Sequence, residues 1–206
     1  MDIEIEAPKQ KPPETGLSLH STYFPTGMPT KNDATGGLLA SQQQTLRTLA
    51  RDFKEYLALR PEAHLILQGH ADPRGGPEYN KLLSQRRVQC TKEFLVEHGV
   101  PASAIERQAP GIERPMSVGQ VKETVQKEPE LTPAQRVWLM RRLGGLALAQ
   151  SRRVDVTLST TGETSARQLP FNAEDALNLI RRRGLARGKS AAQKSASRKH
   201  SVPNQP

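Results

Sequence analysis

Cysteine, aromatic residues and long apolar runs are all scarce in this chain of 206 residues. The one cysteine, Cys90, allows neither an intramolecular disulfide nor a cysteine-based metal site. Aromatic residues make up 4% of the sequence, and no stretch approaches the roughly 20 apolar residues that cross a bilayer. The sequence therefore predicts one modest hydrophobic core, without a disulfide framework and without a transmembrane segment.

Acidic residues are absent from the most basic part of the chain. Residues 181–200 contain eight Lys or Arg and no Asp or Glu, which accounts for eight of the nine net positive charges. The rest of the chain is close to neutral, so we expect the folded part to bind its ligand without attraction by bulk charge. The N-terminal residues 1–16 lack the basic and apolar regions of a signal peptide, and we expect them to be disordered.

Apolar periodicity predicts a single α+β domain over residues 17–160. Alternation predicts strands at 17–24 and 152–160, a short apolar run predicts a buried strand at 64–69, and residues 102–111 are expected to form a strand and turn. Helical spacing predicts helices at 41–60 and 79–98. This β-α-β-α-β-β order predicts a sandwich in which two helices pack on one face of a mixed four-stranded sheet.

Two segments extend beyond this simple order. Residues 117–150 contain a polar stretch and then a helical pattern interrupted by Gly144 and Gly145, which predicts a helical insertion before the last strand. Residues 161–206 form a basic tail, in which we expect a short helix capped at Asn172, with Phe171 as a hydrophobic staple. The remainder of the tail is expected to be disordered.

A buried cation is predicted in the second helix. Arg87 shares one stripe with Leu83, Cys90 and Phe94, so its guanidinium lies where an apolar residue is expected and must find an anion. Asp72, fifteen residues earlier, is the nearest candidate. Two interpretations stay open: the pair forms a structural ion pair, or the two charges are held apart so that a zwitterion bridges them.

The same residues carry a family resemblance. The stretch GHADPRGGPEYNKLLSQRR (69–87) closely resembles the OmpA C-terminal-like domain family, and within it the peptidoglycan-associated lipoprotein-like branch. The resemblance continues in GIERP (111–115) and in SRRVDV (151–156), which is similar to the closing strand of the family. It spans roughly residues 18–160.

The resemblance implies a non-enzymatic module that binds peptidoglycan and anchors the cell envelope to the cell wall. It implies that Asp72 and Arg87 clasp the zwitterionic end of diaminopimelate in the stem peptide. Asn80 and the backbone around Gly75 would add hydrogen bonds, and Arg153 is a weaker candidate. The expected location is the periplasm, associated with the outer membrane, with a Tol-system protein as a possible partner and no cofactor.

Other functions are weighed against this one. His70 has no Ser or Cys nucleophile at a recognisable spacing, and the five histidines show no metal-ligand spacing, so neither catalysis nor a metal site is expected. A flagellar-stator-like wall anchor is one alternative. A second is an intracellular interaction protein whose basic tail binds nucleic acid or another anionic partner, although nucleic acid is disfavoured because no aromatic residues are interleaved with the charges.

Overall fold

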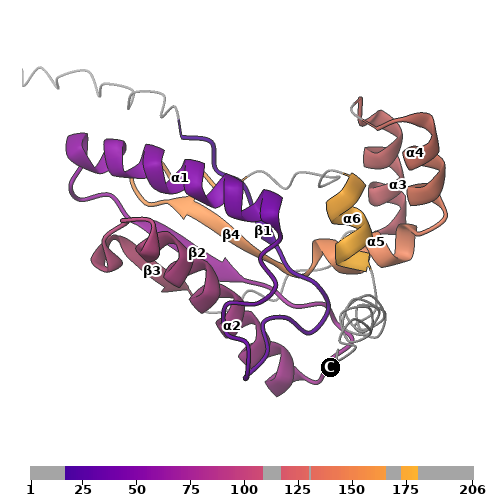
Figure 1. Cartoon of the computed structure of the whole chain (residues 1–206), viewed down its shortest axis with the longest axis horizontal. Coiled ribbons are helices and arrows are strands. Elements are labelled where there is room, and N and C mark those ends of the chain that lie inside the picture. Colours follow the sequence, from indigo (N-terminus) through magenta and orange to yellow (C-terminus); the bar gives the residue numbers. More distant parts are fainter. Residues whose placement is uncertain (1–16, 109–116, 130, 166–172, 181–206) are drawn as a thin grey trace, which may run out of the picture.

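Four strands form one mixed sheet in the computed structural model, which describes residues 17–108, 117–129, 131–165 and 173–180 (Figure 1). The strands are β1 (Thr22–Tyr23), β2 (Leu65–Gly69), β3 (Ile105–Gln108) and β4 (Arg153–Leu158). Their spatial order is β1-β4-β2-β3; β4 runs antiparallel to both β1 and β2, and β3 runs parallel to β2. The predicted mixed four-stranded sheet is confirmed.

Two helices, α1 (Ala40–Leu59) and α2 (Pro77–Glu97), cover one face of this sheet. In α1, the fully buried Leu46, Leu49, Ala50 and Phe53 recur at helical spacing. The strands meet them with alternate side chains, and these are Leu65, Leu67, Val154, Val156 and Leu158. A short 3-10 helix, η1 (Ala102–Ala104), leads from α2 into β3. The predicted sandwich is therefore confirmed.

A glycine at the end of β2 lets α2 approach the sheet closely. A Cβ atom at Gly69 would lie 2.5 Å from the backbone oxygen of Ser84 and 2.8 Å from the Val88 side chain. Any larger residue would push α2 away from the strand. This contact fixes the distance between β2 and α2 at Ser84 and Val88.

Four further helices form a second core at one end of the sheet (Figure 1). They are α3 (Val118–Lys127), α4 (Pro133–Met140), α5 (Leu143–Gln150) and α6 (Ala173–Ile180), and we call them the helical unit. Its buried side chains come from all four helices, from β1 and from the loop before α4: Tyr23, Val121, Val125, Leu131, Leu139, Leu146, Ala147, Ala149, Ala176 and Leu179. Helices α3 to α5 are the predicted insertion, whereas α6 joins them from beyond β4.

The interior of the insertion differs from the prediction in two ways. The polar stretch contains α3, which begins with a capping box formed by Ser117 and Gln120. The break in the following helix lies at Arg141 and Arg142, before the glycines. Gly145 instead lies inside α5, where a Cβ would be 3.0 Å from the Ile180 side chain, so this glycine provides room for α6.

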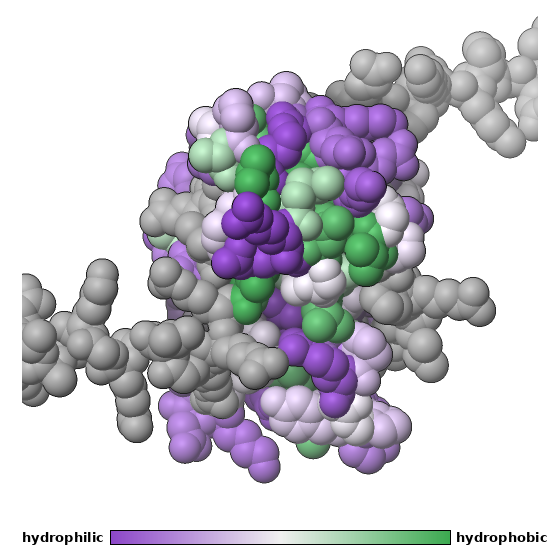
Figure 2. Space-filling view, turned by 90° about the vertical axis from the view of Figure 1, so that its right-hand side faces the viewer, coloured by the Kyte–Doolittle hydropathy of each residue, from purple (hydrophilic) through white to green (hydrophobic). Residues whose placement is uncertain are grey.

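The surface of the helical unit carries both hydrophobic and hydrophilic residues. Hydrophobic and hydrophilic residues are mixed on this side of the molecule (Figure 2), and Val118 and Val137 are about half exposed. Within the described ranges, no helix is both long enough and apolar enough to cross a membrane. The disorder predicted for residues 1–16 and for most of the tail, the cap at Asn172, the staple at Phe171 and the GIERP turn all lie outside the described residues.

Candidate functional site

Asp72 lies in the turn between β2 and α2 and is surrounded by arginines. Its carboxylate accepts hydrogen bonds from the Arg74 side chain, at 2.8 Å to Oδ2 and 3.1 Å to Oδ1, and from the Arg74 backbone amide. Arg152, just before β4, approaches the same carboxylate with Nη1 at 3.3 Å from Oδ2. Asp72 is 8% exposed, whereas the side chain of Arg74 is 48% exposed. The inner arginine is therefore fixed and the outer one has access to solvent.

These arginines determine the charge state of Asp72. Burial by itself raises the pKa of the Asp72 carboxyl, because the charged form loses solvation. The hydrogen bonds from Arg74, together with the positive charges of Arg74 and Arg152, outweigh burial and hold the pKa below its ordinary value. Asp72 is consequently an anion at neutral pH.

A pocket of about 230 Å³ opens beside this carboxylate. Its lining combines the turn after β2, the start of α2 and the loop after β1, and consists of Thr26, Gly27, Asp72, Arg74, Gly75, Tyr79, Asn80 and Leu83. The Asn80 side-chain amide donates to the backbone oxygens of Asp72 and Gly75, at 3.0 Å each. A Cβ at Gly75 would overlap the Asn80 side chain, so glycine is required for this closure of the turn.

Arg87 lies behind the pocket rather than among its lining residues. Its side chain is fully buried and donates from Nη1 to the backbone oxygen of His70 at 2.7 Å and from Nε to that of Met28 at 3.0 Å. Its Nη2 has no hydrogen-bond partner among the described residues. Burial, and then repulsion from Arg152, lower the pKa of Arg87 to about 9, with the Asp72 carboxylate acting in the opposite direction.

Arg153, the weaker candidate, belongs to a different cluster. It forms a bidentate pair with Asp155, with Nε 2.8 Å from Oδ1 and Nη2 2.9 Å from Oδ2. Ser21 donates to the same carboxylate at 2.6 Å, and His70 Nε2 lies 3.1 Å from it. Arg153 is 4% exposed and does not line the pocket. A ligand contact of Arg153 stays a prediction, and this geometry lends it no support.

The structure therefore brings Asp72, Gly75 and Asn80 together at one pocket, with Arg87 directly behind it. Sequence reasoning missed the roles of Arg74 and Arg152, which are the charged partners of Asp72. For Arg74 a signal was available, because a cation two residues after a turn carboxylate can fold back onto it. For Arg152 the resemblance of SRRVDV marks the arginine pair, but the 80 residues that separate it from Asp72 give no sign that the two meet.

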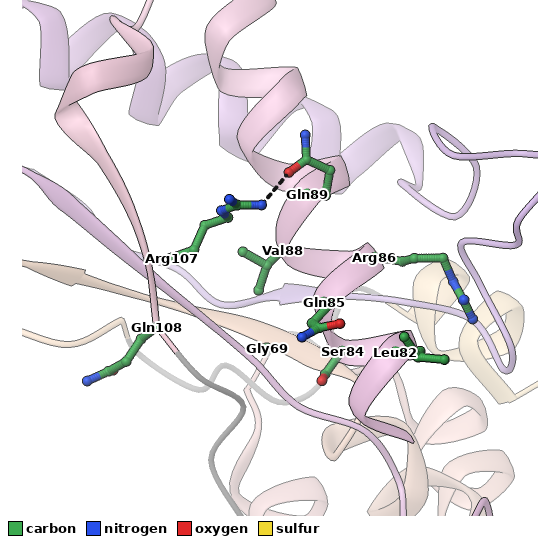
Figure 3. A pocket seen from close by; sticks show the side chains of 9 residues that line it. All are labelled: Gly69, Leu82, Ser84, Gln85, Arg86, Val88, Gln89, Arg107 and Gln108. Carbon is green, nitrogen blue, oxygen red and sulfur yellow. Dashed lines mark hydrogen bonds between the residues drawn. The ribbon is translucent and has the colours of Figure 1, made fainter. Parts of the chain in front are cut away.

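A larger groove of about 570 Å³ runs between α2 and β3 (Figure 3). Its described lining consists of Gly69, Leu82, Ser84, Gln85, Arg86, Val88, Gln89, Arg107 and Gln108, of which none is acidic. Gln89 and Arg107 are joined across it by a 3.1 Å hydrogen bond, whereas Arg86 points to the other side of α2. This lining offers cations and amides without a carboxylate, so it lacks the anion that the ammonium of a zwitterion would need. Over the described residues, no cluster of His, Cys, Asp and Glu side chains forms a metal site.

Comparison with known proteins shows what this chain is similar to. Residues 33–128 match the model of the OmpA family. Peptidoglycan-associated lipoproteins of Brucella melitensis biotype 1 and Agrobacterium fabrum are both 40% identical over 79 residues, which cover 38% of this chain and 45% and 42% of theirs. A protein of the same name in Pseudomonas aeruginosa is 32% identical over 97 residues, covering 38% of this chain and 58% of the relative. The matches thus span about half the length of these curated relatives.

A solved structure is also similar to this chain. The peptidoglycan-associated lipoprotein from Burkholderia pseudomallei is 23% identical, with a TM-score of 0.41, and the match covers 68% of this chain and 90% of that one.

Proposed function

We propose that this chain carries a domain of the OmpA family, binds peptidoglycan non-covalently and anchors the cell envelope to the cell wall. The curated relatives support this proposal, because the three described above are named peptidoglycan-associated lipoproteins. The domain acts as a binding module rather than as an enzyme. Its place is then the periplasmic side of the outer membrane, where the wall is within reach.

The ligand group is the free amino-acid end of diaminopimelate in the stem peptide. This end carries an ammonium and a carboxylate on one carbon atom, so it needs one anion and one cation at short separation. The observation that carries the proposal is the charge imbalance around Asp72. Arg74 and Arg87 are the two cations near this single carboxylate that can turn to a ligand carboxylate, because the donors of Arg152 are engaged by Asp72 and by two backbone oxygens.

Binding proceeds by an exchange of partners at Asp72. Arg74 occupies the carboxylate from the solvent side, and its exposed side chain is free to swing outward. The ligand ammonium then takes its place on Asp72, while the released guanidinium of Arg74 meets the ligand carboxylate. One charge-assisted pair is replaced by two, so the exchange is favourable only for a ligand that brings both charges.

Arg87 provides the second cation. Its Nη2 is a buried donor without a partner among the described residues, and such a donor costs free energy until an acceptor reaches it. A small inward movement of the pocket wall at Leu83, one turn earlier on α2, brings a ligand carboxylate to this donor. Hydrogen bonds to charged groups contribute about 1.5–3 kcal/mol each. Loss of one such bond therefore weakens binding about ten- to hundredfold.

The test is a pull-down of the full chain on purified sacculi, with competition by free diaminopimelate. We compare Asp72→Asn with Asp52→Asn, a substitution of the same chemistry at a carboxylate of α1 whose partner is the exposed Arg51. Asp72→Asn should lose sacculus binding and Asp52→Asn should retain it. Free diaminopimelate should release the wild-type chain, whereas lysine-type sacculi should retain little of it.

The outcomes separate the proposal that the chain binds peptidoglycan from the proposal that it recognises diaminopimelate. If the wild-type chain stays in the supernatant, peptidoglycan binding itself is refuted. If it binds diaminopimelate-type and lysine-type sacculi equally, the domain binds the wall but diaminopimelate is not the recognised group.

A further inference from the structure

Arg152 connects three separate parts of the molecule through one guanidinium. Its Nη1 reaches Asp72 in the pocket at 3.3 Å, and its Nε donates at 3.1 Å to the backbone oxygen of Phe24, which precedes the pocket loop. Its Nη2 donates at 2.5 Å to the backbone oxygen of Leu179 in α6. Arg152 is 2% exposed, so its guanidinium cannot donate to water. The three acceptors replace water as its hydrogen-bond partners.

Helix α6 is held firmly at this position by the rest of the helical unit. Ala176 and Leu179 are fully buried in the second core, and the Ile180 side chain lies over Gly145 of α5. Asp175 accepts hydrogen bonds from Ser41 and Gln42 in the first turn of α1. The Leu179 oxygen is in the last turn of α6, where carbonyl groups have no helical partner and a cation is favourable.

The contact between Arg152 and Asp72 is weaker than the chemistry of the two groups allows. A guanidinium and a carboxylate favour a bidentate pair at about 2.7–2.9 Å. Here a single nitrogen reaches a single oxygen at 3.3 Å, while the other donors are engaged by Phe24 and Leu179. Helix α6 holds Nη2 of Arg152 away from Asp72, whose two oxygens are both bonded to Arg74.

We propose that α6 regulates the ligand pocket through Arg152, which acts as a positioning residue: docked α6 holds the guanidinium back and leaves Asp72 accessible to the ligand ammonium. When α6 leaves the helical unit, Nη2 of Arg152 loses its acceptor inside the protein. The nearest anion is Asp72, so the guanidinium turns into a bidentate pair and competes with the ligand. This inference rests on the proposed diaminopimelate pocket and adds an affinity control built from the helical unit.

Two neighbouring glycines in α5 provide a matched pair of variants. A side chain at Gly145 meets Ile180 and displaces α6, whereas nothing lies within 4 Å of a Cβ at Gly144. In the full chain, Gly145→Leu should bind a soluble diaminopimelate-containing muropeptide about three- to tenfold more weakly than the wild type, and Gly144→Leu should bind unchanged. Adding Arg152→Gln to Gly145→Leu should restore the affinity, because it removes the competing cation.

The ionisation of Asp72 supplies a second readout, followed by NMR titration of its carboxyl carbon. Asp72 faces Arg74 from the turn, Arg87 from α2 and Arg152 from the start of β4. Closer approach of Arg152 lowers the pKa of Asp72, so the titration of Gly145→Leu should move to lower pH than that of Gly144→Leu. In an otherwise wild-type chain, Arg152→Gln should move it to higher pH.

The outcomes keep this inference distinct from the proposed function. A muropeptide that fails to bind the wild type refutes the diaminopimelate pocket, and the titrations of Asp72 still decide whether α6 acts through Arg152. Equal pKa values of Asp72 in the two glycine variants overturn the link. The link is also overturned if the double variant binds the muropeptide more weakly than Gly145→Leu. A merely structural role of Arg152 would make the affinity losses of the two substitutions add. If Gly145→Leu does not fold, an unshifted Asp72 in Arg152→Gln refutes the contact.

Discussion

At the scale of single residues, the pocket is defined by which arginine can leave Asp72. Arg74 reaches the carboxylate from solvent, Arg152 is fixed by two backbone oxygens, and Arg87 donates to backbone oxygens behind the pocket. The hydrogen bonds of Asp72 thus go to Arg74 and Arg152, and not to the Arg87 that the helical stripe suggests. The sequence correctly indicates a buried cation near a carboxylate, but the pairing depends on backbone acceptors that no spacing reveals.

The first prediction at this scale is that Asp72 contributes to the stability of the fold only above acidic pH. Since the pKa of Asp72 is lower in the folded chain than in the unfolded one, the unfolded chain binds the proton first as the pH falls. The stabilisation by Asp72 is therefore complete above the unfolded pKa and disappears as the pH falls through the folded pKa. Asp72→Asn should be less stable than the wild type near neutral pH, and the two should converge in acid. Thermal unfolding of both chains between neutral pH and strong acid measures this. A difference in melting temperature between Asp72→Asn and the wild type that stays constant with pH would contradict the prediction.

Arg87 provides the second prediction, which separates charge from geometry. Arg87→Lys keeps the positive charge, but one ammonium cannot serve the oxygens of Met28 and His70 and a ligand carboxylate as the planar guanidinium does. Sacculus binding should fall about tenfold or more. The matched control is Arg86→Lys, one residue earlier on the more exposed face of α2, which should bind as the wild type does. Equal binding by both variants would show that charge alone suffices at position 87.

At the scale of elements, the main helices and the sheet follow from apolar periodicity, because each element buries one regular face. Three features escaped this reasoning. Helix α3 has only Val121 and Val125 as a short apolar stripe, so its capping box was the stronger signal. Gly145 breaks no helix, since its role is to admit α6. The position of α6 depends on packing between segments far apart in the sequence, which periodicity within one segment does not encode.

The close approach of α2 to β2 leads to a prediction about Gly69. A methyl group there meets the backbone oxygen of Ser84, which cannot rotate away, so α2 must shift. Gly69→Ala should lower the free energy of unfolding by about 1–3 kcal/mol. In contrast, Gly144→Ala in the open part of α5 should raise it by about 0.5–1 kcal/mol, because alanine is the better helix former. Denaturant titrations of both variants test this contrast, and a neutral Gly69→Ala would mean that α2 adapts without strain.

At the scale of the whole molecule, two cores meet at one site. The sheet and α2 provide Asp72 and Arg87, whereas the helical unit provides the acceptor that fixes Arg152. The boundaries of the predicted parts, at residues 16, 117, 150 and 160, remain predictions, and so do a Tol-system partner and the flagellar-stator-like alternative. Because α6 joins the helical unit from beyond residue 160, we expect the functional boundary in the C-terminal part of the chain to lie at Ile180 rather than at the end of β4.

This division yields the last prediction, on chains of different length. A chain ending at Ile180 keeps α6 and loses the eight basic residues that follow, so it should bind sacculi as the full chain does at physiological salt. A chain ending at Ser165 also loses Ala176 and Leu179 from the second core, which for a buried leucine alone costs about 1.5–3 kcal/mol, so it should melt earlier and bind more weakly. Pull-downs at low and high salt compare the three chains, because contacts made by the basic residues weaken as salt rises. Were binding lost already on ending the chain at Ile180, the basic residues would be the ligand contact, and an anionic partner such as nucleic acid would replace the diaminopimelate pocket as the centre of function.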